Sequence, residues 1–202
     1  MITILSLVMF ILILLSVMLV SVSGFGTGAP SGACQDMRPG PPHGDNQAEG
    51  TKPPFDLVAK PLGNKQVKGE TSRIVKASLN LILSVFLKTT TAEQKFRGLL
   101  VMAEVDGDRG HGYFIPALDS KDLVQSLDCK GLSSPCPEPD TCQGTANAVT
   151  HKNNEDKTSV TLIWTPPSKT RGRVVFVATL VGENSSDRSS WWEGVRSNTV
   201  KI

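Results

Sequence analysis

Apolar and polar residues alternate along the chain in short runs, and turn-forming residues separate these runs. The clearest run covers residues 159–164, where Val160, Leu162 and Trp164 alternate with other side chains and so share one face of an extended strand. Pro166-Pro167 ends that run because proline cannot donate to a strand ladder. The pattern predicts a β-strand with one face in a core.

Other runs predict further strands. Residues 173–181 are apolar on both faces, as expected for a central strand. Residues 81–87 fit a strand or a buried helix, and the β-branched residues together with the threonines that follow favour a strand. The remaining predicted strands cover residues 99–105, 113–115 and 199–202. Short strands and few amphipathic runs of helical length predict an all-β antiparallel sandwich.

The segment from Phe25 to about Pro61 is rich in glycine and proline. Such a composition excludes a helix or a central strand. We therefore expect an extended arm that follows the surface and is fixed by Cys34.

The first 24 residues predict a secretory signal peptide, which leaves residues 25–202 as one domain. Residues 2–22 are nearly all apolar and uncharged, and Val22 and Gly24 fit the −3 and −1 positions of a cleavage site. The apolar run lacks a preceding Lys or Arg and is long for a signal peptide, so retention as a membrane anchor is the alternative. After cleavage we expect no membrane association, because no later stretch is long and apolar enough to span a bilayer.

Charge and cysteine content narrow the class of protein. The formal net charge of +2 is too balanced to indicate a nucleic acid or another polyanion as partner. An even number of cysteines beyond the predicted signal indicates two disulfides in an oxidising compartment, with three pairings open; they are Cys34, Cys129, Cys136 and Cys142. The spacing of the last three does not match that of structural zinc sites.

Motifs of common enzymes are missing from the sequence. A nucleophile elbow, a phosphate-binding loop and an H-E-x-x-H helix are all absent. His43, His111 and His151 are far apart and share no helical spacing, so we interpret each as a turn or strand-end residue. Asp106-Gly107-Asp108 lacks the later ligands of a calcium loop and predicts a hairpin turn. We expect no catalytic residues, no metal and no cofactor.

Three surface features are candidates for modification or binding. Asn184-Ser185-Ser186 is an N-glycosylation sequon. Trp191-Trp192 in a strand would point to opposite faces, which places one ring in the core and offers the other as a platform for a ligand. Two basic stretches are candidates for binding anionic groups; they contain Lys60, Lys65, Lys68, Arg73 and Lys76, and Lys169, Arg171 and Arg173. Solvated loop charges are the simpler interpretation of both.

Several motifs occur together in a fixed order along the chain. They are Gly28-Ala29-Pro30-Ser31-Gly32-Ala33-Cys34-Gln35-Asp36-Met37 with His43-Gly44 after it, Phe96-Arg97-Gly98-Leu99-Leu100, Ala148-Val149-Thr150-His151 followed by Lys157 and Trp164-Thr165-Pro166-Pro167, residues 172–181, and Trp192-Glu193-Gly194-Val195. In this order the motifs resemble the reeler domain. That domain occurs in reelin, in F-spondin, in membrane proteins similar to ferric-chelate reductases, and alone in small secreted defence proteins of invertebrates.

The resemblance implies a fold, a disulfide and a function. The fold would be an immunoglobulin-like β-sandwich. The first cysteine of the family pairs with one that precedes the A-V-T segment, which implies Cys34–Cys129 here and leaves Cys136–Cys142 as a local bridge. The function would be that of a secreted, non-enzymatic innate-immunity protein with microbial surface polymers as its partners. An extracellular-matrix or adhesion module that binds heparin-like anionic glycans is the alternative, based on the basic stretches.

Overall fold

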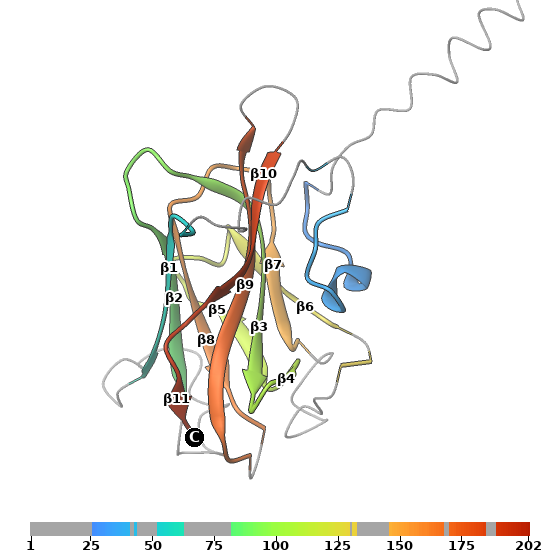
Figure 1. The fold of residues 1–202 in the computed structure, drawn as a ribbon, viewed down its shortest axis with the longest axis vertical. Helices are drawn as coiled ribbons and strands as arrows, with labels where there is room; N and C mark the ends of the chain where they lie inside the picture. The colour runs from blue at the N-terminus through green and yellow to red at the C-terminus, as the bar shows by residue number, and fades with distance from the viewer. Residues whose placement is uncertain are drawn as a thin grey trace, which may run out of the picture.

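The computed structural model describes residues 26–40, 43, 52–62, 82–129, 131–132, 146–167, 170–184 and 189–202. In this part of the chain two antiparallel sheets pack face to face (Figure 1). The four-stranded sheet has the order β1-β2-β8-β5, with β1 Phe55–Pro61, β2 Leu83–Thr89, β8 Ser159–Thr165 and β5 Tyr113–Pro116. The seven-stranded sheet has the path β10-β9-β3-β7-β6, with β10 Ser189–Arg196, β9 Arg173–Asn184, β3 Phe96–Val105, β7 Ala148–His151 and β6 Val124–Leu127. Two short strands complete it: β11 Val200–Lys201 pairs with β9, and β4 Asp108–Arg109 pairs with β3. The prediction of an all-β antiparallel sandwich is confirmed.

The main core lies between the two sheets. Trp164 of β8 is fully buried, its ring contacts Phe176 of β9 edge to face at 5.4 Å, and Phe176 contacts Phe114 of β5 at 5.9 Å. The Trp164 Nε1–H donates to the carbonyl oxygen of His111 at 2.9 Å, which satisfies the polar atom of this buried ring. Residues of both sheets therefore form one aromatic and aliphatic layer.

Strand β9 is an interior strand of its sheet, between β10 and β3, as the apolar pattern on both faces predicts. Val174, Phe176 and Ala178 pack in the main core. Val177 lies on the opposite face in a second apolar cluster, described below. Both faces of β9 are therefore covered.

The expected arm to Pro61 is partly wrong, because its last seven residues form strand β1. Phe55, Leu57 and Ala59 are buried and alternate with more exposed residues. Strand β1 lies at the edge of its sheet, where a neighbouring proline is tolerated. The period of two was present in the sequence, but the surrounding prolines obscured it.

Two local predictions have different outcomes. Asp106-Gly107 forms the predicted turn between β3 and β4, with φ of 48° and 93°. The proposed tryptophan platform is wrong: Trp191 is 8% exposed, and Trp192 packs its ring on Phe55 at 5.1 Å. Trp191 is buried, and Trp192 is half-buried against the main core.

In the described part of the chain, no helix has the length and apolar character needed to cross a membrane.

Candidate functional site: a pocket beneath the N-terminal arm

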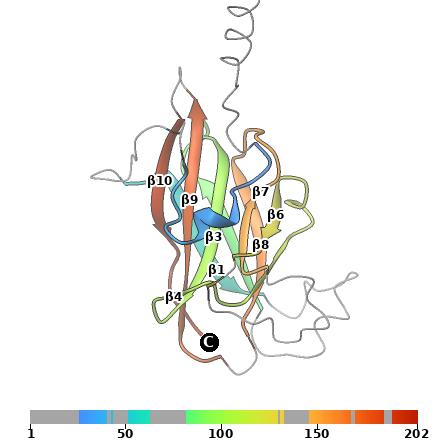
Figure 2. The same cartoon turned by 90° about the vertical axis from the view of Figure 1, so that its right-hand side faces the viewer.

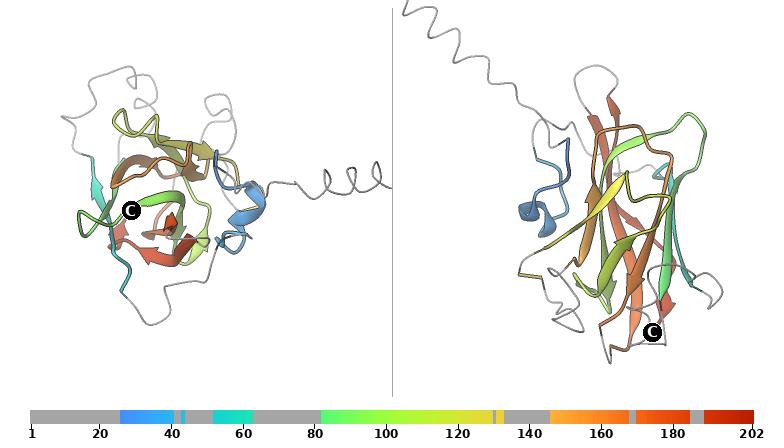
Figure 3. Two further views of the ribbon diagram at one scale, coloured as in Figure 1. Left: turned by 90° about the horizontal axis from the view of Figure 1, so that it is seen from above. Right: turned by 180° about the vertical axis from the view of Figure 1, so that it is seen from behind.

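Residues 26–40 and 43 form an arm that lies across the outer face of the seven-stranded sheet. Figure 2 shows this segment in blue in front of β3, between β9 and β7. Its short 3-10 helix covers Ser31–Cys34, and Met37 adopts a positive φ of 59°, which turns the chain after it. The views in Figure 3 show that the arm lies on one side of the sandwich, away from the four-stranded sheet.

A disulfide and a second apolar cluster hold the arm in place. Cys34 is bonded to Cys129, 95 residues later, and both are buried. This pairing agrees with the one that the resemblance implies, whereas Cys136 and Cys142 lie outside the described residues. Around the bond pack residues of the arm and of the outer sheet face, namely Met37, Leu100, Met102, Ala148 and Val177. The arm therefore has its own small core on the outer face.

Polar contacts fix the two ends of the arm. The Ala29 N–H donates to Thr150 Oγ1 at 2.7 Å, and the Gln125 side chain donates to the Thr27 carbonyl oxygen at 2.6 Å. Further along, Arg38 donates to Glu193 of β10 at 2.8 Å, in an ion pair exposed to solvent. These contacts attach one end of the arm to β6 and β7 and the other end to β10.

Between these attachments the arm and the sheet form an open pocket of about 480 Å³. Its roof is formed by residues of the arm between Gly26 and Gly40 and by His43, and its floor is formed by β3 and β9 together with His151 and Asn154. The roof contributes Ala29, Pro30, Ala33, Met37 and Pro39, and the floor adds Leu100 and Val181, so most of the lining is apolar. This volume lies within the range of small-molecule sites, about 300–1,000 Å³.

A β-bulge shapes the floor. Phe96 pairs with Gly182 and Gly98 pairs with Val181, so Arg97 is the extra residue in β3. A Cβ added to Gly98 would lie 3.1 Å from the Val181 Cβ, which explains why the bulge carries a glycine. The bulge brings both Arg97 and Gly98 to the pocket.

The bulge also orients one imidazole of the pocket. The backbone N–H of Leu99 donates to His151 Nδ1 at 3.3 Å. Nδ1 also lies 3.3 Å from Thr150 Oγ1 and 3.5 Å from the carbonyl oxygen of Leu99, so these contacts with β3 and β7 fix the position of the ring.

His43 lies on the roof of the same pocket. Burial, and secondly the charge of His151, lower the pKa of His43. The two imidazoles are thus close enough to affect each other, although 108 positions separate them in the sequence. The interpretation of each as an isolated turn or strand-end histidine is incomplete, because the fold brings them to one pocket.

Thr179 of β9 also lines the pocket. The residue is 4% exposed, and its hydroxyl is the buried side-chain polar atom that lacks a hydrogen-bond partner within the described structure. Buried polar groups are nearly always paired, and each exception needs an explanation. The floor of the pocket therefore buries one hydroxyl that no described protein group satisfies.

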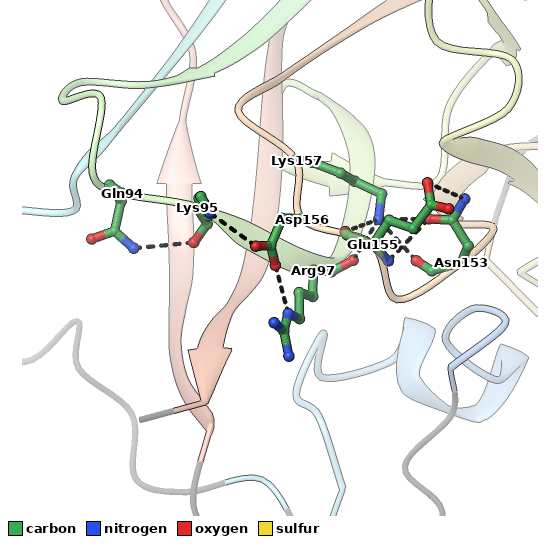
Figure 4. Close-up of polar contacts among 7 residues, drawn as sticks. All are labelled: Gln94, Lys95, Arg97, Asn153, Glu155, Asp156 and Lys157. Carbon is green, nitrogen blue, oxygen red and sulfur yellow. Dashed lines mark hydrogen bonds and ion pairs between the residues drawn. The ribbon is translucent and has the colours of Figure 1, made fainter. Parts of the chain in front are cut away.

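Arg97, which lines the pocket, also belongs to a cluster of charged residues (Figure 4). Asp156 accepts from Arg97 Nε at 2.6 Å and from Lys95 Nζ at 3.0 Å, and these bonds, the one from Arg97 first, lower the pKa of Asp156. Next to it lies Lys157, which is 1% exposed. Its ammonium group donates to four oxygens at 2.7–3.0 Å; they are the carbonyls of Arg97, Asn153 and Glu155 and the side-chain Oδ1 of Asn153. Burial lowers the pKa of Lys157 to about 8, against the opposing effect of the Glu155 and Asp156 charges. Lys157 thus binds the bulge of β3 to the loop over residues 153–156.

The predicted ligand-binding residues lie elsewhere. Lys60 is the next-to-last residue of β1, Arg173 begins β9, and Arg171 lies two residues before it; all three are exposed. They share one end of the sandwich, because β11 pairs with the start of β9 and Asn198, just before β11, bonds the backbone of Ala59. Lys65, Lys68, Arg73, Lys76 and Lys169 lie outside the described residues. Asn184 is the last residue of β9, and whether its sequon is glycosylated remains a prediction.

The residues that line the pocket were not singled out as a site from the sequence, although a signal existed. His43, Arg97, Gly98 and His151 all belong to the motifs on which the resemblance rests, and those motifs converge on the pocket. Thr179 lies in the motif over residues 172–181. No single stretch shows the pocket, because its parts come together through the disulfide and the strand order.

Metal binding has no support in the described residues, where no three His, Cys, Asp or Glu side chains gather in a way that would hold an ion. The expectation of no metal and no cofactor stays a prediction for the whole chain.

Several known proteins are similar to this chain in sequence or in fold. The sequence is 30% identical over 193 residues to "Putative defense protein Hdd11" of Hyphantria cunea, covering 94% of this chain and 96% of the relative. It is 34% identical over 184 residues to "Putative defense protein 1" of Antheraea mylitta, covering 89% and 88%. The crystal structure of the reelin-N domain of F-spondin matches 79% of this chain and 91% of its own, with 18% identity and a TM-score of 0.45. The profile of the Reeler domain matches residues 32–202, and the chain therefore belongs to the Reeler domain family.

Proposed function

We propose that this protein is a secreted, non-enzymatic component of innate immunity that binds surface polymers of microbes. The observation that carries the proposal is similarity over nearly the whole chain to insect proteins named as defence proteins. The Cys34–Cys129 disulfide supports an extracellular setting, because such bonds persist in oxidising compartments.

Secretion through cleavage after Gly24, and a glycan on Asn184, belong to the same proposal. A peptide map of the secreted protein, digested without reduction, reports the mature N-terminus, the cysteine pairing and the occupancy of Asn184 together. A mature chain that starts at Phe25 is the expected result. Recovery of residues 1–24 in membrane-bound protein would replace secretion with anchoring.

Binding to microbes is tested by sedimentation of the purified protein with bacteria, and by capture on immobilised lipopolysaccharide and β-glucan. We expect saturable binding to at least one of these surfaces. Absence of binding to all three would overturn the proposal.

A matrix or adhesion role with heparin-like glycans is the second candidate, and the exposed Lys60, Arg171 and Arg173 at one end of the sandwich favour it. On a heparin column, elution below physiological salt would count against this role, since charge-driven binding must persist at that ionic strength. The variant Lys60→Ser/Arg171→Ser/Arg173→Ser should elute earlier than its parent.

The matched control removes the same charge elsewhere. Lys88, Lys121 and Lys152 are also exposed, and Lys88 pairs with Asp56 at the opposite end of β1 from Lys60. Lys88→Ser/Lys121→Ser/Lys152→Ser should elute near its parent if the first set forms the binding surface. Equal shifts for both triple variants would indicate a response to net charge, and would reject a localised glycan site.

A further inference from the structure

We propose that the pocket beneath the arm binds a small, apolar and uncharged molecule. This inference goes beyond the proposed function, because such a molecule is not a surface polymer of a microbe. Capture of microbial polymers can succeed or fail whether or not the pocket holds a ligand, and the two proposals are tested by separate measurements.

The apolar character of the ligand follows from the walls of the pocket. Side chains of the arm, such as Pro30 and Ala33, and of the sheet, such as Leu100 and Val181, line a space of about 480 Å³. A mainly apolar lining of this extent is typical of small-molecule sites. These four side chains form no hydrogen bonds, so the hydroxyls of a sugar would lose water beside them without gaining partners. A hydrocarbon chain or ring has no such loss.

The fold keeps this apolar lining in contact with water. The disulfide, the Ala29–Thr150 bond and the Arg38–Glu193 pair fix the roof at separate points, and between them the arm leaves an open space above β3 and β9. Apolar surface in contact with water is unfavourable, and a ligand that fills the pocket removes this surface from water. Because the roof is already fixed, binding does not need to order it.

The charged residues of the pocket favour a ligand without a charge. Among the described residues that line it, Asp36, Arg38 and Arg97 are charged, and each has a partner within the protein. Arg38 pairs with Glu193 at 2.8 Å, and its backbone N–H donates to Asp36 Oδ1 at 2.9 Å. Arg97 pairs with Asp156 at 2.6 Å. An acid or an amine would have to compete with these bonds, or would lose its water in the pocket without gaining a partner.

The imidazole of His43 on the roof agrees with an uncharged ligand. Burial, and secondly the charge of His151, lower the pKa of His43, so the neutral form of this ring is favoured. The roof therefore does not provide a stable positive charge for an anionic ligand at neutral pH.

The first experiment titrates the secreted, disulfide-bonded protein with N-phenyl-1-naphthylamine, an uncharged aromatic probe whose fluorescence rises in apolar surroundings. We expect saturable binding at one site per chain, and displacement of the probe by decanol. Decanoate and decyltrimethylammonium have a chain of the same length and a charge, so each should compete at least about tenfold more weakly than decanol. Absence of saturable binding would overturn the proposal, and so would competition by either ion that equals that of the alcohol.

Two variants place the probe at the floor of the pocket. Val181→Phe adds a ring to the floor and should weaken probe binding at least about tenfold. Val175→Phe is its matched control, because Val175 lies on the same strand and, by the alternation along β9, on the same face, but does not line the pocket. Equal losses in both variants would show that the probe binds elsewhere and would overturn the proposal.

A variant of the roof keeps the test valid if Val181→Phe fails to fold. Gly32 lines the pocket, and a Cβ added to it would meet no atom within 4 Å, so Gly32→Leu fits the fold and should weaken probe binding at least about threefold. Ser31→Leu is its control, because Ser31 lies in the same 3-10 helix, is exposed and does not line the pocket. Urea midpoints confirm which variants are folded. Unchanged probe affinity in the folded floor and roof variants would overturn the proposal.

Discussion

Replacement of Lys157 by methionine removes a buried ammonium group and keeps a side chain of similar length. The ammonium donates to four oxygens, three of them backbone carbonyls, which join the bulge of β3 to the loop before Lys157. Because an ammonium carries three hydrogens, one of them is shared between two oxygens. Lys157→Met leaves all four oxygens without this donor.

The magnitude follows from two opposing contributions. Three hydrogen bonds to a charged group contribute about 1.5–3 kcal/mol each. Burial acts in the other direction, because it lowers the pKa of Lys157 to about 8 and so disfavours the charged form in the folded protein. Residues 154–156 are exposed, so water partly replaces the lost donor at this loop. We therefore expect Lys157→Met to lower the free energy of unfolding by about 3 kcal/mol.

Urea unfolding followed by tryptophan fluorescence measures the effect through the shift of the midpoint at constant slope. Lys152→Met is the control, since Lys152 is exposed and pairs with Asp122 at 4.0 Å, and such contacts contribute about 0–1 kcal/mol. A loss below about 1 kcal/mol in Lys157→Met would refute the view that this ammonium holds the loop.

The same pair of proteins tests the titration of Lys157. Between pH 8 and 10.5 the Lys157 side chain is deprotonated in the folded protein but still protonated in the unfolded chain. Lys157 therefore increases the free energy of unfolding as pH rises through this range. Its contribution is fully present above the ordinary pKa and is lost as pH falls through about 8. The difference in stability between the parent and Lys157→Met should therefore widen from pH 7.5 to pH 10. A constant or narrowing difference would contradict the lowered pKa.

Other substitutions test the two apolar clusters and the pocket. Trp164→Ala should cost about 3–5 kcal/mol in urea unfolding, because the ring is fully buried between the sheets; a nearly neutral result would contradict its place in the core. Cys34→Ser/Cys129→Ser should lower stability by about 2–5 kcal/mol, measured as the shift in midpoint under non-reducing conditions, and no shift would mean that the bond does not constrain the fold. Thr179→Val should raise stability by about 1 kcal/mol in the absence of ligand, since it removes a buried hydroxyl without a partner; a loss would indicate a partner for that hydroxyl.

The sequence predicts most of the sandwich because its strands carry a local signal. The alternation of Val160, Leu162 and Trp164 and the apolar run of β9 each identify a strand from adjacent residues alone. Strands β6 and β7 were not predicted as strands, because β6 has two polar residues among its four and β7 is buried at three consecutive positions, so neither shows an alternating pattern. A run that short does not establish a period of two.

The pocket depends on contacts between distant parts of the chain, which local patterns do not contain. His43 and His151 share a pocket because the disulfide holds the arm over β3 and because β7 pairs with that strand. Arg97 reaches the pocket only because a bulge shifts the register of β3 against β9. The motifs that resemble the reeler domain contained these residues, but their order along the chain does not show which of them meet.

The attachment of the arm affects where a recombinant version of the domain should begin. A chain that started at residue 52 would keep both sheets but uncover Leu100, Met102 and Val177, and it would leave Cys129 with an unpaired thiol. Such a protein is expected to self-associate and to form intermolecular disulfides. A start at residue 32, where the family profile begins, would keep Cys34 but lose the Ala29 bond to Thr150 and the Thr27 bond to Gln125. A recombinant chain should therefore begin at or before residue 26, so that it contains the complete arm.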